Sequence, residues 1–179
     1  MKLPTDVSST FPAADGDGYE LQMGRWSRRL ARQFLDFVGS ADGESVLDVG
    51  CGTGSLTFAL KERCQPKHLR GVDFSPVYIE HAARQNHDPR IAFEVGDACA
   101  LAFPDRTFDR VLSLLMLHFV PKADQAIAEM RRVARAGAVV GTAVWDARGG
   151  TLPLACSLIR QLCWTPRQAS AAHAALPAQ

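Results

Sequence analysis

The sequence predicts an α/β protein with a Rossmann-like, doubly wound fold, in which helices cover both faces of a mostly parallel sheet of about five readable strands. Short apolar segments of strand length alternate along the chain with longer segments whose apolar residues recur every three to four positions. A glycine-rich turn follows the first of these strands, as in open parallel sheets that bind a ligand. With 47% apolar residues in a chain of 179, the protein can bury one core.

Five short apolar runs are the expected strands, and helical segments separate most of them. Strands that are separated by helices pair in parallel and are covered on both faces, so these runs are expected to form one parallel sheet. The expected strands are residues 45–49, 69–73, 91–95, 109–115 and 138–144.

The expected helices have amphipathic spacing. The first runs from Gly24 to about Gly39, with apolar residues on one face and arginines at the other positions. A second follows the glycine-rich turn, and a third begins with Ser75 as its N-cap and Pro76 in its first turn. A fourth carries on one face Ala123, Ile127, Met130 and Ala134.

The chain divides into three expected segments. Residues 1–18 are rich in proline, serine, aspartate and glycine, a composition that cannot order itself by burial, so a flexible leader is expected. Residues 19–145 hold all five strands and form the domain. Residues 146–179 are expected to form a helical tail, in which one helix carries Leu154, Leu158 and Leu162 and another begins at Thr165 and Pro166.

Charge and composition argue against several classes of function. Twenty basic residues against nineteen acidic ones create no field that would hold nucleic acid or anionic lipid. The longest apolar run, residues 111–120, is half of what a membrane span needs, and the N-terminus lacks a secretory signal, so a cytoplasmic protein is expected. The five cysteines form no C-x-x-C pair, so we expect neither a disulfide framework nor a zinc site, and no metal.

The segment from Val46 to Gly54 carries the most information. Glycines at positions 50, 52 and 54 follow a buried strand, where they let the backbone approach a ligand closely. A nicotinamide-binding loop has the spacing G-x-G-x-x-G and binds a pyrophosphate, but here the third glycine comes one residue early. Asp48 would repel a pyrophosphate and favour a cofactor with an amino group and a sulfonium. The loop therefore favours S-adenosylmethionine.

Further motifs follow in order along the chain. They are LDVGCGTG at 47–54, GVDFS at 71–75, VGDA at 95–98, FPD at 103–105, FD at 108–109, and RV at 132–133 through Gly137. Through them the stretch from about Tyr19 to Trp145 resembles a class I S-adenosylmethionine-dependent methyltransferase, of the type that includes the quinone-biosynthesis and small-molecule enzymes. The resemblance implies a methyl transfer from this cofactor to a small-molecule acceptor.

The expected cofactor site lies at the carboxyl ends of the first three strands. Asp73 ends the second strand, where a carboxylate can accept hydrogen bonds from both ribose hydroxyls, and Phe74 is expected beside the adenine. The resemblance assigns the adenine amino group to Asp97 and a ring nitrogen to the amide of Ala98, although aspartate is also common in turns and caps. The full set of expected cofactor-binding residues is Tyr19, Arg25, Asp48, Gly50, Cys51, Gly52, Asp73, Phe74, Asp97, Ala98 and Leu114.

The residues around Tyr19 and Trp26 resemble the N-terminal cap of many of these enzymes, which closes over the methionine end of the cofactor. There Arg25 could pair with the carboxylate of the cofactor. A solvated arginine on an amphipathic helix is the alternative interpretation. For Leu114, at the end of the fourth strand, the alternative to lining the cofactor is a place in the core.

The acceptor can be narrowed further. Enzymes that methylate bases of nucleic acids resemble one another in an Asn/Asp-Pro-Pro-Tyr/Phe motif, but this chain has SLLM at 113–116, so a small apolar or aromatic acceptor is expected. The sulfonium already activates the methyl group, so the protein mainly aligns the acceptor in line with it and excludes water. His118 is the candidate general base, and the interpretation we favour over it is a histidine packed at a strand end.

The pattern of the family breaks at the C-terminus. Such enzymes usually continue through two more strands, one of them antiparallel, so the sequence predicts a truncated chain whose fifth strand is an exposed edge open to self-association. Two other functions therefore remain as alternatives. One is a cofactor-binding but inactive remnant, and the other, disfavoured by the glycine spacing and Asp48, is a nicotinamide-dependent oxidoreductase.

Overall fold

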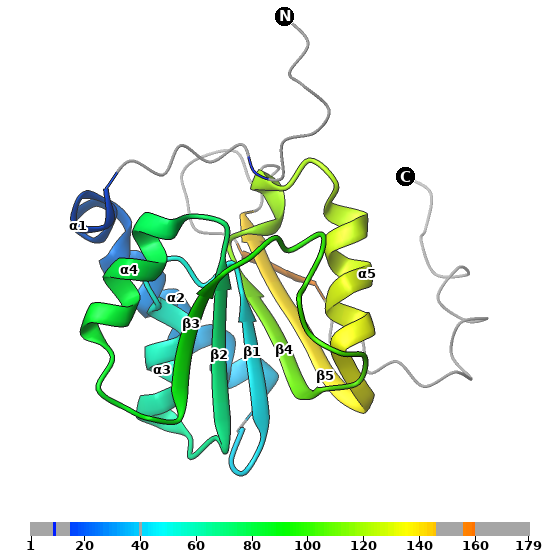
Figure 1. Ribbon diagram of the computed structural model, residues 1–179. Coiled ribbons are helices and arrows are strands. Elements are labelled where there is room, and N and C mark those ends of the chain that lie inside the picture. The colour runs from blue at the N-terminus through cyan, green and yellow to red at the C-terminus, as the bar shows by residue number, and fades with distance from the viewer. Residues whose placement is uncertain (1–8, 10–14, 40, 146–155, 160–179) are drawn as a thin grey trace, which may run out of the picture.

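A six-stranded sheet forms the centre of the protein, shown as a computed structural model in Figure 1, which describes residues 9, 15–39, 41–145 and 156–159. The strands lie in the order β3-β2-β1-β4-β5-β6. Neighbours among β1 to β5 pair in parallel, and β6 runs antiparallel to β5. The strands are β1 (Ser45–Val49), β2 (His68–Asp73), β3 (Ile91–Val95), β4 (Phe108–Leu114), β5 (Ala134–Trp145) and β6 (Cys156–Ile159).

Helices cover both faces of this sheet (Figure 1). On one face, Phe34 of α2 and Leu60 of α3 share a core with Leu112 of β4. On the opposite face, Met130 of α5 shares a second core with Val111 of β4. None of the described helices is long and apolar enough to cross a membrane. The helices are α1 (Gly16–Tyr19), the π-helix η1 (Glu20–Gly24), α2 (Arg25–Val38), α3 (Ser55–Arg63), α4 (Pro76–Gln85), the 3₁₀ helix η2 (Leu117–Phe119) and α5 (Ala123–Val133).

The predicted parallel sheet is confirmed, and the largest difference among its predicted strands is the start of β5. The sequence predicted Ala134 as the last turn of a helix, but Ala134 begins β5 and pairs with Phe108. The helix ends earlier because the amide of Thr107 donates to the carbonyl of Val133 at 2.7 Å, which draws the chain into the sheet. Gly137 then adopts a φ of 81° where the register of β5 against β4 shifts.

The expected flexible leader does not extend to residue 18. Asp15 caps α1, because its carboxylate accepts hydrogen bonds from the amides of Asp17 and Gly18 at 3.1 and 3.0 Å. Gly16 packs so closely on His81 of α4 that an added Cβ would lie 2.9 Å from the imidazole. This tertiary contact orders a segment whose composition alone predicted a loop.

The expected helical tail is also corrected, because Cys156–Ile159 form strand β6. Leu158, placed by the sequence on a helix, pairs with Ala143 of β5. The antiparallel strand that we expected to be missing is therefore present, and the edge of β5 is paired from Thr142 to Trp145. Unpaired strand amides are costly, which favours a strand over a helix at this position. The rest of the expected tail, including Leu154, Leu162 and the helix from Thr165, lies outside the described residues.

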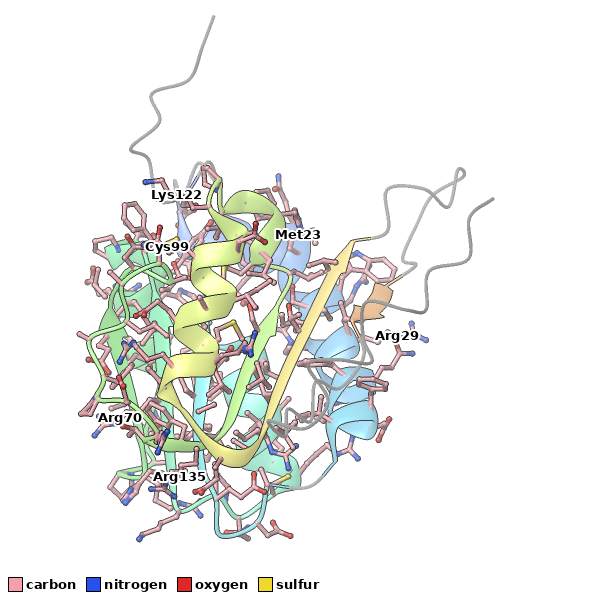
Figure 2. All side chains as sticks on the ribbon, turned by 90° about the vertical axis from the view of Figure 1, so that its right-hand side faces the viewer. Met23, Arg29, Arg70, Cys99, Lys122 and Arg135 are labelled. Atoms are coloured by element: carbon pink, nitrogen blue, oxygen red, sulfur yellow. The ribbon has the colours of Figure 1, made fainter. Side chains whose placement is uncertain are left out.

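Figure 2 distinguishes the two ends of the sheet. Arg70 and Arg135 lie at one end, where Arg135 pairs with Asp109 near the start of β4. Cys99 and Lys122 lie at the opposite end, which holds the loops that follow the parallel strands. Ligands of open α/β sheets bind at this second end.

Candidate functional site

Two adjoining cavities lie at the carboxyl ends of the parallel strands. The larger has a volume of about 340 Å³ and the smaller about 30 Å³. Four residues line both cavities, namely Tyr19, Gly50, Gly52 and Leu114. The expected site residues Asp73, Phe74, Asp97 and Ala98 line the larger cavity, and Asp48 and Cys51 line the smaller one.

The glycine loop forms the floor between the two cavities. Gly50 has a φ of 73°, and an added Cβ would lie 2.2 Å from Cγ of Met116, so both backbone conformation and space require glycine there. Gly52 has a φ of 55° but no atom within 4 Å of the position of an added Cβ. At Gly52 the turn alone requires glycine, and the space beside it is open to a ligand.

Asp73 is held rigidly at the end of β2. Its carboxylate accepts hydrogen bonds from the amides of Gly52 at 2.9 Å and Ser75 at 2.8 Å. Burial raises the pKa of Asp73, and these two hydrogen bonds oppose the rise. Ser75 also caps α4 as the sequence predicted, since its hydroxyl accepts from the amide of Tyr78. Asp73 thus links the glycine loop to α4 and presents a fixed acceptor to the larger cavity.

The third strand contributes a turn that presents Asp97 and Ala98. One carboxylate oxygen of Asp97 accepts a hydrogen bond from the amide of Cys99 at 2.8 Å, and Asp97 forms a bridge with Ala100. This turn holds Asp97 against the larger cavity. Phe74, across the cavity lining, has 52% of its surface exposed, so its ring is available to pack on a planar group.

Asp48 is fully buried below the glycine loop. One carboxylate oxygen accepts a hydrogen bond from the hydroxyl of Thr57 at 2.7 Å, and the other, Oδ1, has no partner among the described residues. Burial raises the pKa of Asp48 to about 7, and the charge of Asp73 adds to the rise. The hydroxyl of Ser55, which lines the same small cavity, also has no partner in the described part of the chain.

Tyr19 brings the N-terminal segment to both cavities. Its hydroxyl lies 3.3 Å from that of Ser27, and its ring centroid lies 5.2 Å from that of Tyr78. Burial raises the pKa of Tyr19 and raises that of Tyr78 to about 12, so both rings are neutral phenols. The predicted cap is therefore built as an aromatic contact between η1 and α4 rather than through Arg25.

The sequence reasoning missed two residues that fasten this cap. The carboxylate of Glu20 accepts a hydrogen bond from the hydroxyl of Thr53 in the glycine loop and pairs with Arg28 of α2. Thr53 was visible as the polar residue between Gly52 and Gly54, but the sequence carries no signal that pairs it with Glu20.

Three expected site residues lie differently from the rest. Arg25 is exposed, with its guanidinium 5.3 Å from the ring centroid of Trp26, and it lines neither cavity. His118 is exposed on η2 with its ring centroid 4.2 Å from that of Phe119, and it also lines neither cavity. Burial lowers the pKa of His118. Cys51 does line the small cavity, where burial raises the pKa of its thiol.

An apolar wall completes the larger cavity. Its residues come from the end of β4 and from η2, and Leu115 adopts a φ of 63°, which branched side chains rarely adopt. The amide of Leu115 donates to the carbonyl of Ala143 at 2.8 Å, which holds this strained backbone in place. The wall consists of Leu114, Leu115, Met116, Phe119 and Val120.

This arrangement matches a known family. Residues 46–137, just over half of the chain, match the family described as "Methyltransferase domain". The chain belongs to this methyltransferase family. The matched segment includes the glycine loop, Asp73 and Asp97, so the resemblance expected from the sequence is confirmed.

Individual methyltransferases share both sequence and fold with the chain. It is 35% identical to the erythromycin 3''-O-methyltransferase of Saccharopolyspora erythraea, over 69% of this chain and 45% of that protein. It is 35% identical to the demethylmenaquinone methyltransferase of Renibacterium salmoninarum, over 76% of this chain and 57% of that protein. A methyltransferase of Haloferax volcanii, solved with the Trm112 methyltransferase activator, has a TM-score of 0.70 at 26% identity, covering 78% of this chain and 62% of that one. The chain thus spans about half the length of these two relatives.

Proposed function

We propose that the protein binds S-adenosylmethionine at the carboxyl ends of β1, β2 and β3 and transfers its methyl group to a small apolar or aromatic acceptor. The observation that carries this proposal is the pair of adjoining cavities, which combine acidic strand ends with an apolar wall. Membership of the methyltransferase family supports the reaction class.

The residues present fit this cofactor. The fixed carboxylate of Asp73 would accept hydrogen bonds from the ribose hydroxyls, while Phe74, Asp97 and Ala98 would hold the adenine. The open space beside Gly52 admits a ligand against the loop, and the unpartnered Oδ1 of Asp48 would accept from an amino group. Among the described residues that line the two cavities there is no lysine, arginine or histidine, which suits a cationic ligand.

The cofactor supplies an electrophilic methyl group, and the protein has to orient and shield. The apolar wall from Leu114 to Val120 would press the acceptor toward the methyl group and keep water from that face. Tyr19 would close the opposite side, because its ring is held against Tyr78. A displacement of this kind needs alignment more than proton transfer, consistent with the distance of His118 from both cavity linings.

The apolar wall also supports the proposed acceptor class. Leucine, methionine, phenylalanine and valine side chains bury apolar surface and offer no charge to bind a phosphate. The two relatives are named for erythromycin and demethylmenaquinone, and a further relative of 35% identity is named a fatty-acid O-methyltransferase. We therefore expect an organic acceptor with a substantial apolar portion.

The two alternatives are separated by binding and turnover. A nicotinamide cofactor would place its pyrophosphate against Asp48 and Asp73 with no cation in the described lining. Calorimetry should show binding of S-adenosylhomocysteine, the demethylated product, and none of NADH. Radiolabelled methyl transfer to the acceptors of a metabolite extract then tests turnover. Binding without transfer would leave the inactive remnant as the correct interpretation, and NADH binding without S-adenosylhomocysteine binding would overturn the proposal.

A further inference from the structure

The small cavity contains two polar atoms that lack hydrogen-bond partners. Oδ1 of Asp48 and the hydroxyl of Ser55 both line it, and neither has a partner among the described residues. Asp48 is 0% exposed and Ser55 9% exposed, so bulk water does not compensate them. Buried polar atoms without partners cost free energy, so this cavity is suited to a group that donates hydrogen bonds.

The lining of the cavity favours a cation among such donors. The titratable groups that face Asp48 are Tyr19 of α1, Cys51 of the glycine loop and Asp73 of β2, and none of them carries a positive charge. The remaining polar groups are neutral hydroxyls, and the side chains from the start of α3 and the end of β4 that complete the lining are apolar. A volume of about 30 Å³ admits one small group, and a primary ammonium has three N–H donors and no acceptor. The hydroxyls are those of Ser27, Thr53, Ser55 and Thr57, and the apolar side chains are Leu56 and Leu114.

Without a ligand the buried acid is stabilised in its neutral form. Burial raises the pKa of Asp48 to about 7, with a further contribution from Asp73, and the hydrogen bond from Thr57 opposes the rise. At neutral pH a large share of the molecules therefore holds a proton on Asp48. A carboxylate beside an ammonium is stable without that proton, because the cation replaces its charge.

We propose that the small cavity is an ammonium subsite, which a ligand amine enters in exchange for the proton of Asp48. The acid loses H⁺ to solvent, the resulting carboxylate pairs with the ammonium, and one unit of positive charge enters as one leaves. The inference rests on the proposed function, in which the amine belongs to the amino-acid part of S-adenosylmethionine. It adds that cofactor binding releases a proton and weakens in acid.

Two ligands separate the amine from the nucleoside. S-adenosylhomocysteine carries the amino acid, whereas 5′-methylthioadenosine carries the same nucleoside and thioether without it. We expect the affinity for S-adenosylhomocysteine to rise at least about tenfold from about pH 5.5 to about pH 8, because the ionised fraction of Asp48 rises by that factor or more. 5′-Methylthioadenosine reports any titration of Asp73, and its affinity should change less.

Calorimetry in two buffers counts the proton directly. In phosphate and in Tris at about pH 6.5, the difference in binding enthalpy should correspond to more than about half a proton released per S-adenosylhomocysteine in excess of the value for 5′-methylthioadenosine. An equal release with both ligands would assign the proton to Asp73 and overturn the inference.

Variants assign the effect to Asp48. Asp48→Asn should weaken S-adenosylhomocysteine binding and abolish its pH dependence while 5′-methylthioadenosine binds as before. Thr57→Val removes the hydrogen bond that favours the carboxylate, so the midpoint of the pH dependence should move upward. Ser55→Ala should weaken S-adenosylhomocysteine without moving the midpoint. Ser113→Ala, which removes a buried unpartnered hydroxyl that lies outside the small-cavity lining, should change neither ligand.

The outcomes distinguish the inference from the proposed function. If S-adenosylhomocysteine binds with an affinity that does not depend on pH, the ammonium exchange is wrong and the proposed function stands. If neither nucleoside binds at any pH, the proposed function fails and the inference fails with it. If Asp48→Asn does not fold, an unmoved midpoint in Thr57→Val contradicts the inference.

Discussion

The buried acid Asp48 should make the ligand-free protein less stable as the pH rises. Its pKa is raised from 3.8 to about 7 in the folded protein, whereas in the unfolded chain it ionises at its ordinary value. Between about pH 4 and about pH 7 the folded state therefore binds more protons than the unfolded state, so the free energy of unfolding falls as the pH rises. Above about pH 7 the penalty no longer grows.

The size of this penalty follows from the shift. A difference of about three pKa units corresponds to about 4 kcal/mol at full ionisation, of which about 3 kcal/mol develops between about pH 4.5 and about pH 8. Asp48→Asn removes the titrating group but keeps a carbonyl oxygen that can accept from the hydroxyl of Thr57. Its advantage over the wild type should therefore be small in acid and grow by about 3 kcal/mol as the pH rises.

Urea unfolding of the ligand-free proteins at several pH values measures this difference. Asp124→Asn, which removes a carboxylate from the exposed start of α5, controls for the loss of one negative charge. An advantage of Asp48→Asn that stays constant within about 0.5 kcal/mol from acid to alkaline pH would show that Asp48 is ionised throughout, and the reasoning from its burial would be wrong.

Three other substitutions test the site. Asp73→Ala should weaken S-adenosylhomocysteine binding by about 1 to 3 kcal/mol, the range for stranding partners of a charged group, and an unchanged dissociation constant would remove Asp73 from the site. Gly50→Ala should lower the free energy of unfolding more than Gly52→Ala, because only at Gly50 would the added Cβ meet Met116, and equal losses in urea unfolding would mean that φ strain alone matters. His118→Ala should leave S-adenosylhomocysteine affinity intact and lower the methylation rate less than tenfold, whereas a loss of about a hundredfold would make His118 the general base.

The parallel core could be predicted because its signals are local. Val46, Leu47 and Val49 form a run without polar interruption apart from Asp48, and all three are fully buried in β1. A carboxylate inside such a run is unusual enough to indicate a functional role from sequence alone. The glycines that follow it identify the turn by backbone conformation, and the turn has the positive φ angles that glycine allows.

The two ends of the described chain could not be predicted, because long-range contacts determine their structure. Gly16 is ordered by His81, and β6 is a strand because β5 offers unpaired backbone groups beside it. Neither partner lies within the window in which hydrophobic periodicity is detected. The regular leucine spacing of the tail therefore favoured a helix that tertiary pairing overrides.

The position of Arg25 shows a different limit. An amphipathic pattern indicates which face of a helix is buried, but it cannot say whether an exposed arginine turns toward a ligand or along the helix. In α2 the guanidinium of Arg25 lies over Trp26, so the cap is fastened instead by Tyr19 and Glu20. The aromatic residue of the predicted cap reaches the site, and the cationic one does not.

The electrostatics of the site connect the choice of cofactor with the stability of the empty protein. Asp48, Asp73 and Asp97 lie at the ends of three neighbouring strands, and no basic side chain stands among the described residues of the two linings. Burial raises the pKa of Asp48 and Asp73, so the ligand-free site holds carboxyl groups whose ionisation is costly. An anionic ligand would increase this cost, a neutral one would leave it, and a cationic one would remove part of it. A ligand that carries both a sulfonium and an ammonium is therefore the kind that this arrangement of acids is best suited to select.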